Sequence, residues 1–148
     1  LVKEITKLAN EDSDLFRLQV DETDIYNFKA WIKGPDGTPF AGGFFEVALE
    51  FTQGWPAKAP LASFVTKVFH ANVSCTGAIC VSSLQKDWQT SWGITDVLNV
   101  ICSLLIHPNP DSALNEEASE LMHERYDDYY RIATLWTKVH ASFIPPCF

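Results

Sequence analysis

Residues 26–51 read YNFKAWIKGPDGTPFAGGFFEVALEF, and this stretch decides the fold class. Apolar residues alternate with polar ones on both sides of its centre: Tyr26, Phe28, Ala30 and Ile32, then Phe45, Val47, Leu49 and Phe51. A period of two is typical of strands that bury one face. Gly34-Pro35-Asp36-Gly37 between the two runs has the composition of a turn. The stretch therefore predicts two neighbouring strands of an antiparallel sheet.

The residues on either side extend this sheet. Phe16, Leu18 and Val20 alternate in the same way and predict an earlier strand, and Ala62–Thr66 predicts a fourth. Short polar connections favour an antiparallel meander with one face against helices. Before the sheet, Leu1, Ile5 and Leu8 recur at helical spacing and predict a short amphipathic helix.

The C-terminal third reads as helical. Apolar residues return at helical spacing from Ile94 and predict a nearly buried helix that Pro108 and Pro110 end: Val97, Leu98, Ile101, Leu104 and Leu105. A further helix is predicted to start at Asn115, an N-cap residue type followed by Glu116 and Glu117. The last helix is predicted from about Glu124 to His140, with five residues on one face: Tyr129, Ile132, Ala133, Trp136 and Val139. The fold class is therefore α+β.

Length and composition indicate one globular domain, residues 1–148, with 47% hydrophobic residues. The net charge of −8 argues against a partner such as nucleic acid or an anionic membrane. No apolar run is long enough for a membrane helix, and no signal peptide pattern is present. A domain of this size does not need disulfides, so its four cysteines are expected to be reduced, in the cytoplasm or the nucleus.

The segment from Phe69 to Ser91 shows no steady period and is predicted to be a long ordered loop, a common place for function. It contains His70, Asn72 and Cys80. Taken alone, the apolar flank of Cys80 is more typical of a buried, inert cysteine. A thiol near an imidazole and an amide can also perform acyl chemistry, with the amide stabilising an oxyanion. Alternatively, His70 and Asn72 only tie down the loop backbone.

Other candidate sites have weaker support. Cys75 and Cys80 lie five residues apart, and no second pair of ligands has zinc-finger spacing. Asp127-Asp128 is typical of a solvated helix face rather than of paired carboxylate catalysis. Trp88 and Trp92 are more typical of packing than of binding in a chain this aromatic.

The order of these residues resembles the active-site segment of ubiquitin-conjugating enzymes. Val68-Phe69-His70-Ala71-Asn72 is followed by Thr76-Gly77-Ala78-Ile79-Cys80. In that family a His-Pro-Asn tripeptide precedes the thioester cysteine by eight residues counted from the Asn, as Asn72 precedes Cys80. Further matches occur along the chain: Gly42-Gly43-Phe44-Phe45, Trp55-Pro56, Pro60, Trp88, Ile101–Leu105, Pro108-Asn109-Pro110, Tyr130–Ala133 and Trp136-Thr137.

The resemblance implies a UBC-like fold with an N-terminal helix, a four-stranded antiparallel sheet and C-terminal helices. It also implies that Cys80 carries ubiquitin or a ubiquitin-like modifier as a thioester and passes it to a substrate lysine. Asn72 would steady the oxyanion or hold the loop that does so, and His70 would brace that loop. Ser112, or in part Asp111, would lie beside the incoming lysine.

Partners also follow from the resemblance. They are the modifier, protein substrates, an activating enzyme bound through the N-terminal helix with Lys3 and Lys7, and a ligase. The ligase would meet the loops near Pro56 and Ala57 and near Thr90 and Ser91. No cofactor or metal is implied, because the activating enzyme uses the ATP.

The chain also departs from the family pattern. Ala71 replaces the proline of His-Pro-Asn, and Ser82 and Ser112 stand where acids are frequent. Ala57 replaces a common aromatic, and Thr90-Ser91 replaces a Pro-Ala pair, so ordinary RING-type ligases are not implied. An alternative is a catalytically inactive, ubiquitin-binding scaffold subunit of the same fold. A Cys-His hydrolase is a third alternative, but His70 has no evident orienting partner in the sequence.

Overall fold

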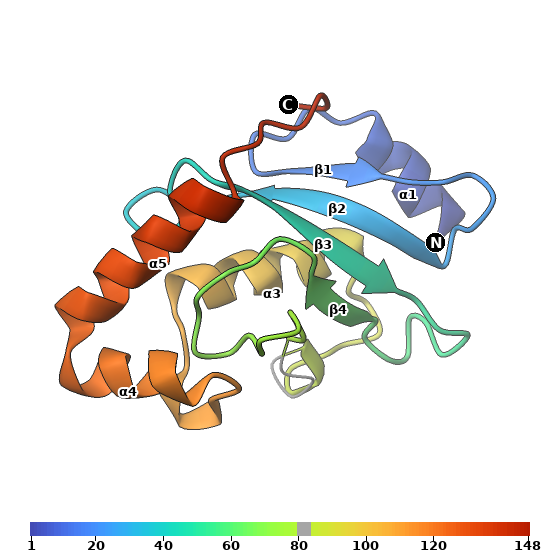
Figure 1. Ribbon diagram of the computed structural model, residues 1–148. Helices are drawn as coiled ribbons and strands as arrows, with labels where there is room; N and C mark the ends of the chain where they lie inside the picture. Colours follow the sequence, from blue (N-terminus) through green and yellow to red (C-terminus); the bar gives the residue numbers. More distant parts are fainter. Residues whose placement is uncertain (80–83) are drawn as a thin grey trace.

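The computed structural model describes residues 1–79 and 84–148 (Figure 1). Helix α1 (Val2–Ala9) comes first, and four strands follow: β1 (Phe16–Gln19), β2 (Asn27–Lys33), β3 (Phe44–Glu50) and β4 (Leu61–Phe64). The second half contains α3 (Ile94–Ile106), the 3₁₀ turn η1 (Pro110–Ser112), α4 (Glu116–Glu124) and α5 (Tyr126–His140). The predicted α+β class and the order of its elements are confirmed.

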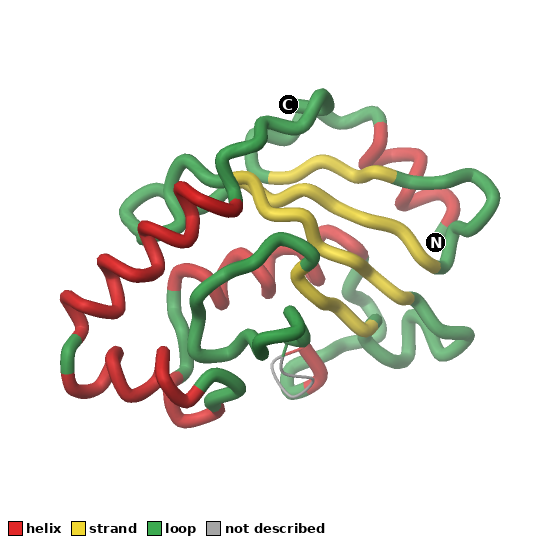
Figure 2. The backbone as a smooth tube through the Cα atoms, viewed as in Figure 1, coloured by secondary structure: helices red, strands yellow, loops and turns green. Residues whose placement is uncertain are grey.

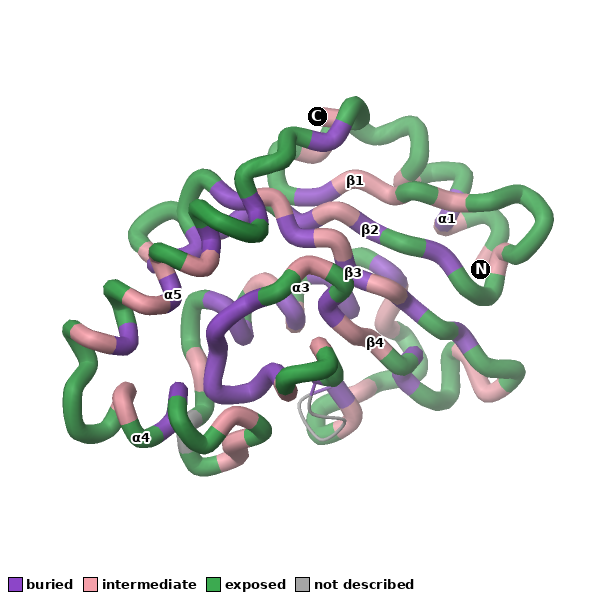
Figure 3. The backbone as a smooth tube through the Cα atoms, in the orientation of Figure 1, coloured by how far each residue is buried: buried purple, intermediate pink, exposed green. Residues whose placement is uncertain are grey.

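The sheet is an antiparallel meander in the order β1-β2-β3-β4, as predicted. Phe28 pairs with Leu49 and Ile32 pairs with Phe45, so the apolar sets of β2 and β3 share one buried face. Figure 3 shows the resulting alternation of buried and more exposed positions along these strands. Strand β4 ends at Phe64 rather than at the predicted Thr66, because the Val65 and Thr66 N–H groups both donate to the Glu46 carbonyl.

Helix α3 lies behind the sheet (Figure 1) and buries six apolar side chains: Ile94, Val97, Leu98, Ile101, Leu104 and Leu105. It ends at Ile106, two residues before Pro108, because a proline disfavours helical geometry in the residue before it. The Glu4 carboxylate accepts the N–H of Ile94 at 3.2 Å, which ties α1 to the start of α3.

The two last helices meet at Arg125, whose φ of −145° interrupts the helix. Helix α5 therefore begins at Tyr126 rather than at about Glu124. Asn115 caps α4 as predicted, since its side chain accepts the Ala118 N–H at 3.1 Å.

The assignment of Val139 to the apolar face of the last helix was wrong. Val139 is 63% exposed, whereas Tyr129, Ala133 and Thr137 are buried. These three follow each other at intervals of four, and at 100° per residue Val139 lies about 120° around the helix from Ala133.

A long connection joins β4 to α3 (Figure 2). It is ordered where it is described, because isolated bridges pair Ser63 with Ala78 and Val73 with Ile79. Cys80 and Ser82, on which two expectations fall, lie outside the described residues. Within the described residues, no helix is long and apolar enough to cross a membrane.

Candidate active site

His70 is fully buried, and both of its ring nitrogens are engaged. Nδ1 lies 3.0 Å from the backbone nitrogen of Asn72 and accepts its N–H. Nε2 lies 2.8 Å from the Leu104 carbonyl oxygen, which can only accept, so the ring proton is on Nε2. Burial lowers the pKa of His70 to about 4, although the Leu104 hydrogen bond opposes this shift. A neutral imidazole with no free lone pair braces the loop and cannot act as a base there.

Asn72 is also fully buried and forms a clamp to a loop 37 residues later in the chain. Its Nδ2 donates to the carbonyl oxygens of Asn109 at 2.6 Å and Ser112 at 3.0 Å. Its Oδ1 accepts the N–H of Asn109 at 2.8 Å. The amide group thus holds both ends of the segment 109–112 against the His-Ala-Asn turn.

Ala71 adds a second link between the same two segments. Its carbonyl oxygen accepts the N–H groups of Leu114 at 2.8 Å and Asn115 at 3.1 Å. Asn115 is the N-cap of α4, so this link also sets where that helix begins. His70, Ala71 and Asn72 together fix the position of residues 109–115.

Ser112 and Asp111 lie in the clamped segment, within η1. The Asn109 side chain organises this turn, because its Oδ1 accepts the N–H of Asp111 at 3.1 Å and its Nδ2 lies 3.4 Å from the Ser112 hydroxyl. Ser112 is partly buried, whereas Asp111 is exposed. The structure therefore brings Asn72 and Ser112 together and leaves the carboxylate of Asp111 in solvent beside them.

The approach to Cys80 is pinned to the edge of the sheet. The Gly77 carbonyl accepts the Phe64 N–H at 2.7 Å, and Gly77 has a φ of +90°. A Cβ at this position would lie 2.0 Å from the Phe64 carbonyl oxygen, so only glycine fits. The placement of residues up to Ile79 is set by these contacts, and Cys80 itself lies outside the described residues.

The other three cysteines are free thiols. Cys75 and Cys147 are exposed, and Cys102 is partly buried on α3. Burial raises the pKa of Cys102 to about 11, which makes it a poor nucleophile at neutral pH. Within residues 1–79 and 84–148, no three side chains of His, Cys, Asp or Glu are grouped so that they could hold a metal.

Comparison with known proteins gives consistent matches. The family model for ubiquitin-conjugating enzymes matches residues 1–137. The chain is 45% identical over 142 residues to ubiquitin-conjugating enzyme E2 S from Nematostella vectensis, which covers 96% of this chain and 70% of that protein. It is 43% identical to E2 S from Drosophila melanogaster, over 96% of this chain and 68% of that protein.

A solved structure agrees with these matches. The crystal structure of a candidate ubiquitin conjugating enzyme from Plasmodium yoelii superposes with a TM-score of 0.89 at 32% identity, over 97% of this chain and 94% of that one. The chain belongs to the ubiquitin-conjugating enzyme family. It is a transferase of the class that works through a thioester.

The sequence does not predict that Asn109 helps to hold the site of this ubiquitin-conjugating enzyme together. In the sequence Asn109 stands out only as part of Pro108-Asn109-Pro110, yet its backbone accepts and donates in the Asn72 clamp and its side chain caps η1. An asparagine between two prolines is a typical turn residue, and that composition was the available signal.

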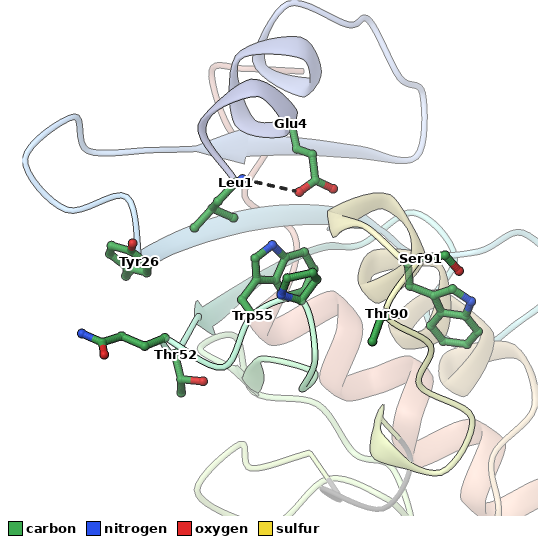
Figure 4. A pocket seen from close by; sticks show the side chains of 10 residues that line it. Leu1, Glu4, Tyr26, Thr52, Trp55, Thr90 and Ser91 are labelled. Carbon is green, nitrogen blue, oxygen red and sulfur yellow. Dashed lines mark ion pairs between the residues drawn. The ribbon is translucent and has the colours of Figure 1, made fainter.

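The loops expected to meet a ligase lie side by side in the enzyme. The Trp88 indole N–H donates to the Pro56 carbonyl at 2.8 Å, and the Trp55 and Trp88 rings are 5.3 Å apart. Next to them a groove of about 480 Å³ is lined by residues from α1 and from both loops (Figure 4): Leu1, Glu4, Tyr26, Thr52, Gln53, Trp55, Pro56, Thr90, Ser91 and Trp92. Ala57 is exposed beside it and does not line it.

The residues expected to meet the activating enzyme are accessible. Lys3 and Lys7 are exposed and lie one helical turn apart on α1. Lys7 is 3.8 Å from Glu11, an exposed ion pair that contributes little to stability.

Proposed function

We propose that this enzyme accepts the C-terminal carboxyl of ubiquitin as a thioester on Cys80 and transfers it to a substrate lysine. The observation that carries the proposal is the Asn72 clamp, which holds Asn109 and Ser112 beside the His-Ala-Asn turn. Cys80 follows Ile79, which bridges to Val73, the residue next to Asn72. The bridge therefore joins the residue after Asn72 to the residue before Cys80. The E2 S relatives favour ubiquitin as the modifier.

Transfer begins when the lysine nitrogen attacks the thioester carbonyl carbon. A tetrahedral oxyanion forms, and its collapse makes the amide bond and expels the Cys80 thiolate, a good leaving group. The lysine must lose a proton in this step. His70 cannot take it, because both ring nitrogens are engaged. We propose that the proton passes to solvent water and that Ser112 and the exposed carboxylate of Asp111, in the same turn, form the environment of the amine.

Asn72 serves this step mainly by positioning. Both N–H groups of its amide donate to backbone carbonyls, so it donates to an oxyanion only by releasing Asn109 or Ser112. Its role as the holder of the loop is therefore the one that the hydrogen bonds support.

We further assign the partner surfaces. The activating enzyme binds through α1 with Lys3 and Lys7, and a ligase binds at the loops of Pro56–Ala57 and Thr90–Ser91. Residues 1–148 form one catalytic domain that works in the cytoplasm or nucleus. Replacing Lys3 and Lys7 by Glu should slow charging by roughly tenfold in a salt-dependent way, since exposed charges mainly affect association. Each single replacement, Lys3→Glu or Lys7→Glu, is compared with Lys138→Glu, which reverses one exposed lysine on α5.

A two-stage assay tests the proposed function. The chain is first charged with ubiquitin, activating enzyme and ATP, and the ATP is then removed and free lysine added. We expect a reducible adduct that disappears as lysine is ubiquitinated. An adduct that forms but never discharges to an amine, with or without a ligase, would instead favour a carrier or scaffold role.

A further inference from the structure

Ser112 is held both by its backbone and by its side chain. Its N–H donates to the Asn109 carbonyl at 3.2 Å, and its own carbonyl accepts an N–H of the Asn72 amide at 3.0 Å. Its hydroxyl oxygen lies 3.4 Å from Asn109 Nδ2, which makes a long hydrogen bond. Because the backbone on both sides of the Ser112 side chain is fixed, Asn109 Nδ2 acts on the one part that can still rotate.

The orientation of the Asn109 amide follows from its backbone partner. Its Oδ1 accepts the Asp111 N–H at 3.1 Å, and a backbone N–H can only donate. The other end of the amide is therefore the NH₂ group, which faces the Ser112 hydroxyl oxygen. Since Nδ2 can only donate, the Ser112 oxygen is the acceptor in this pair. The hydroxyl keeps its own O–H and one lone pair for other partners.

The Asn109 side chain is separate from the Asn72 clamp. The clamp uses the backbone of Asn109, whose N–H and carbonyl both bond to the Asn72 amide. Asn109 is exposed, so water competes for its side-chain amide, and the bond to Ser112 contributes little to the free energy of unfolding. The main effect of this bond is to restrict the direction in which the Ser112 hydroxyl points.

We propose that Asn109 is a positioning residue for transfer to lysine and that it acts through the Ser112 hydroxyl. This inference rests on the proposed function. Asn109 Nδ2 holds the Ser112 oxygen so that its remaining lone pair accepts one N–H of the incoming amine. The lone pair of the amine nitrogen then faces the thioester carbonyl carbon, and such orientation lowers the barrier to attack.

The transfer step balances without a proton on Ser112. The C–N bond forms, the C–S bond of the thioester breaks, and the sulfur leaves as a thiolate. The amine loses its proton to water, while Ser112 accepts a hydrogen bond and exchanges nothing. Ser112 therefore orients the nucleophile and does not act as its base.

Asn109→Ser separates the two bonds of the Asn109 side chain. Serine keeps an oxygen that can accept the Asp111 N–H in a turn, but its side chain is one atom shorter and does not reach the Ser112 oxygen. The enzyme is charged with ubiquitin, the ATP is removed, and the adduct is discharged in parallel to free lysine and to hydroxylamine. We expect discharge to lysine to be about 3–10-fold slower, the effect of one lost hydrogen bond. Charging and discharge to hydroxylamine should not change, because hydroxylamine is a stronger nucleophile that depends less on orientation.

A double-mutant cycle tests whether Asn109 acts through the hydroxyl. Ser112→Ala removes the oxygen and should slow discharge to lysine at least as much as Asn109→Ser does. Adding Asn109→Ser to Ser112→Ala should then cause no further loss, since both changes remove the same contact. The matched control is Asn27→Ser, which replaces another exposed asparagine at the start of β2 and should discharge normally.

Three results would overturn the inference and leave the proposed function standing. The first is an unchanged lysine rate in Asn109→Ser, and the second is a cycle in which the two losses multiply. The third is an equal slowing of charging, hydroxylamine discharge and lysine discharge, or a large drop in melting temperature, because Asn109 would then only support the loop. An unchanged enzyme that charges but never discharges to lysine would overturn the proposed function, and this inference with it.

Discussion

His70 and Asn72 use their side chains for support. Both ring nitrogens of His70 and both N–H groups of the Asn72 amide are bonded to backbone groups inside the protein. These buried bonds join the His-Ala-Asn turn to the end of α3 and to the 109–112 segment. At the scale of single residues, we therefore propose that the two side chains act on the reaction through the loop that they hold.

Replacing Asn72 by Ala tests this role. Three backbone groups of Asn109 and Ser112 would lose their partners, so we expect a loss of about 1–3 kcal/mol of unfolding free energy. If the loop is what matters, charging and lysine discharge should both slow. A protein of unchanged stability whose discharge alone falls by about 10²–10³ would point to direct oxyanion support instead. Urea unfolding and single-turnover kinetics on the same samples separate these results.

The burial of His70 predicts a pH dependence of stability. Burial lowers its pKa from 6.5 to about 4, so between these values the unfolded chain binds a proton that the folded chain does not. The contribution of neutral His70 to the free energy of unfolding is therefore fully present above pH 6.5. It falls by about 3 kcal/mol as the pH drops to 4.

His70→Gln isolates this contribution. Gln keeps a polar side chain but does not titrate, so the stability advantage of the native protein over the variant should shrink on acidification. Urea denaturation at pH 7, 5.5 and 4.5 measures it. Parallel pH curves for the two proteins would show that His70 is not held neutral.

Among the structural elements, the connection from β4 to Cys80 depends most on one backbone conformation. Gly77 combines a φ of +90° with a carbonyl oxygen 2.0 Å from where a Cβ would be. Gly37 has a similar φ of +75° in the turn between β2 and β3 but has no atom within 4 Å of that position. The two glycines therefore separate backbone preference from steric conflict.

Gly77→Ala should destabilise the enzyme by about 1–3 kcal/mol more than Gly37→Ala, and it should slow charging of the cysteine three residues later. The control should lose only about 1–2 kcal/mol and charge normally. Thermal melts and initial charging rates provide the comparison. Equal effects of the two changes would mean that the Phe64 contact is not needed to place the loop.

The elements also differ in how far the sequence predicts them. Strands β2 and β3 and helix α3 were predicted because local period and burial agree along their whole length. The break between α4 and α5 was predicted only to within two residues, since no proline or glycine marks its position at Arg125. The clamp could not be foreseen because Asn72 and Asn109 are 37 residues apart, and periodicity carries no information on such pairs. Residues 142–148 have no period at all, and their contacts depend on where α5 ends.

At the scale of the whole molecule, the functional surfaces are separate. The lysines proposed to meet the activating enzyme lie on α1, the loops proposed to meet a ligase lie near that helix, and the clamp holds the 109–115 segment. The departures at Ala57, Thr90 and Ser91 fall on the proposed ligase surface, whereas Ala71 falls at the clamp. If the proposed ligase surface is right, changes there should leave the clamp intact.

The central claim is that Cys80 is the residue that carries ubiquitin, and one gel tests it most directly. Each cysteine is replaced by Ser in turn, and each variant is incubated with activating enzyme, ATP and ubiquitin, then run with and without reducing agent. We predict that Cys75→Ser, Cys102→Ser and Cys147→Ser still form the reducible adduct, and that Cys80→Ser forms only an oxyester that resists thiols. A reducible adduct that persists in Cys80→Ser would contradict the account.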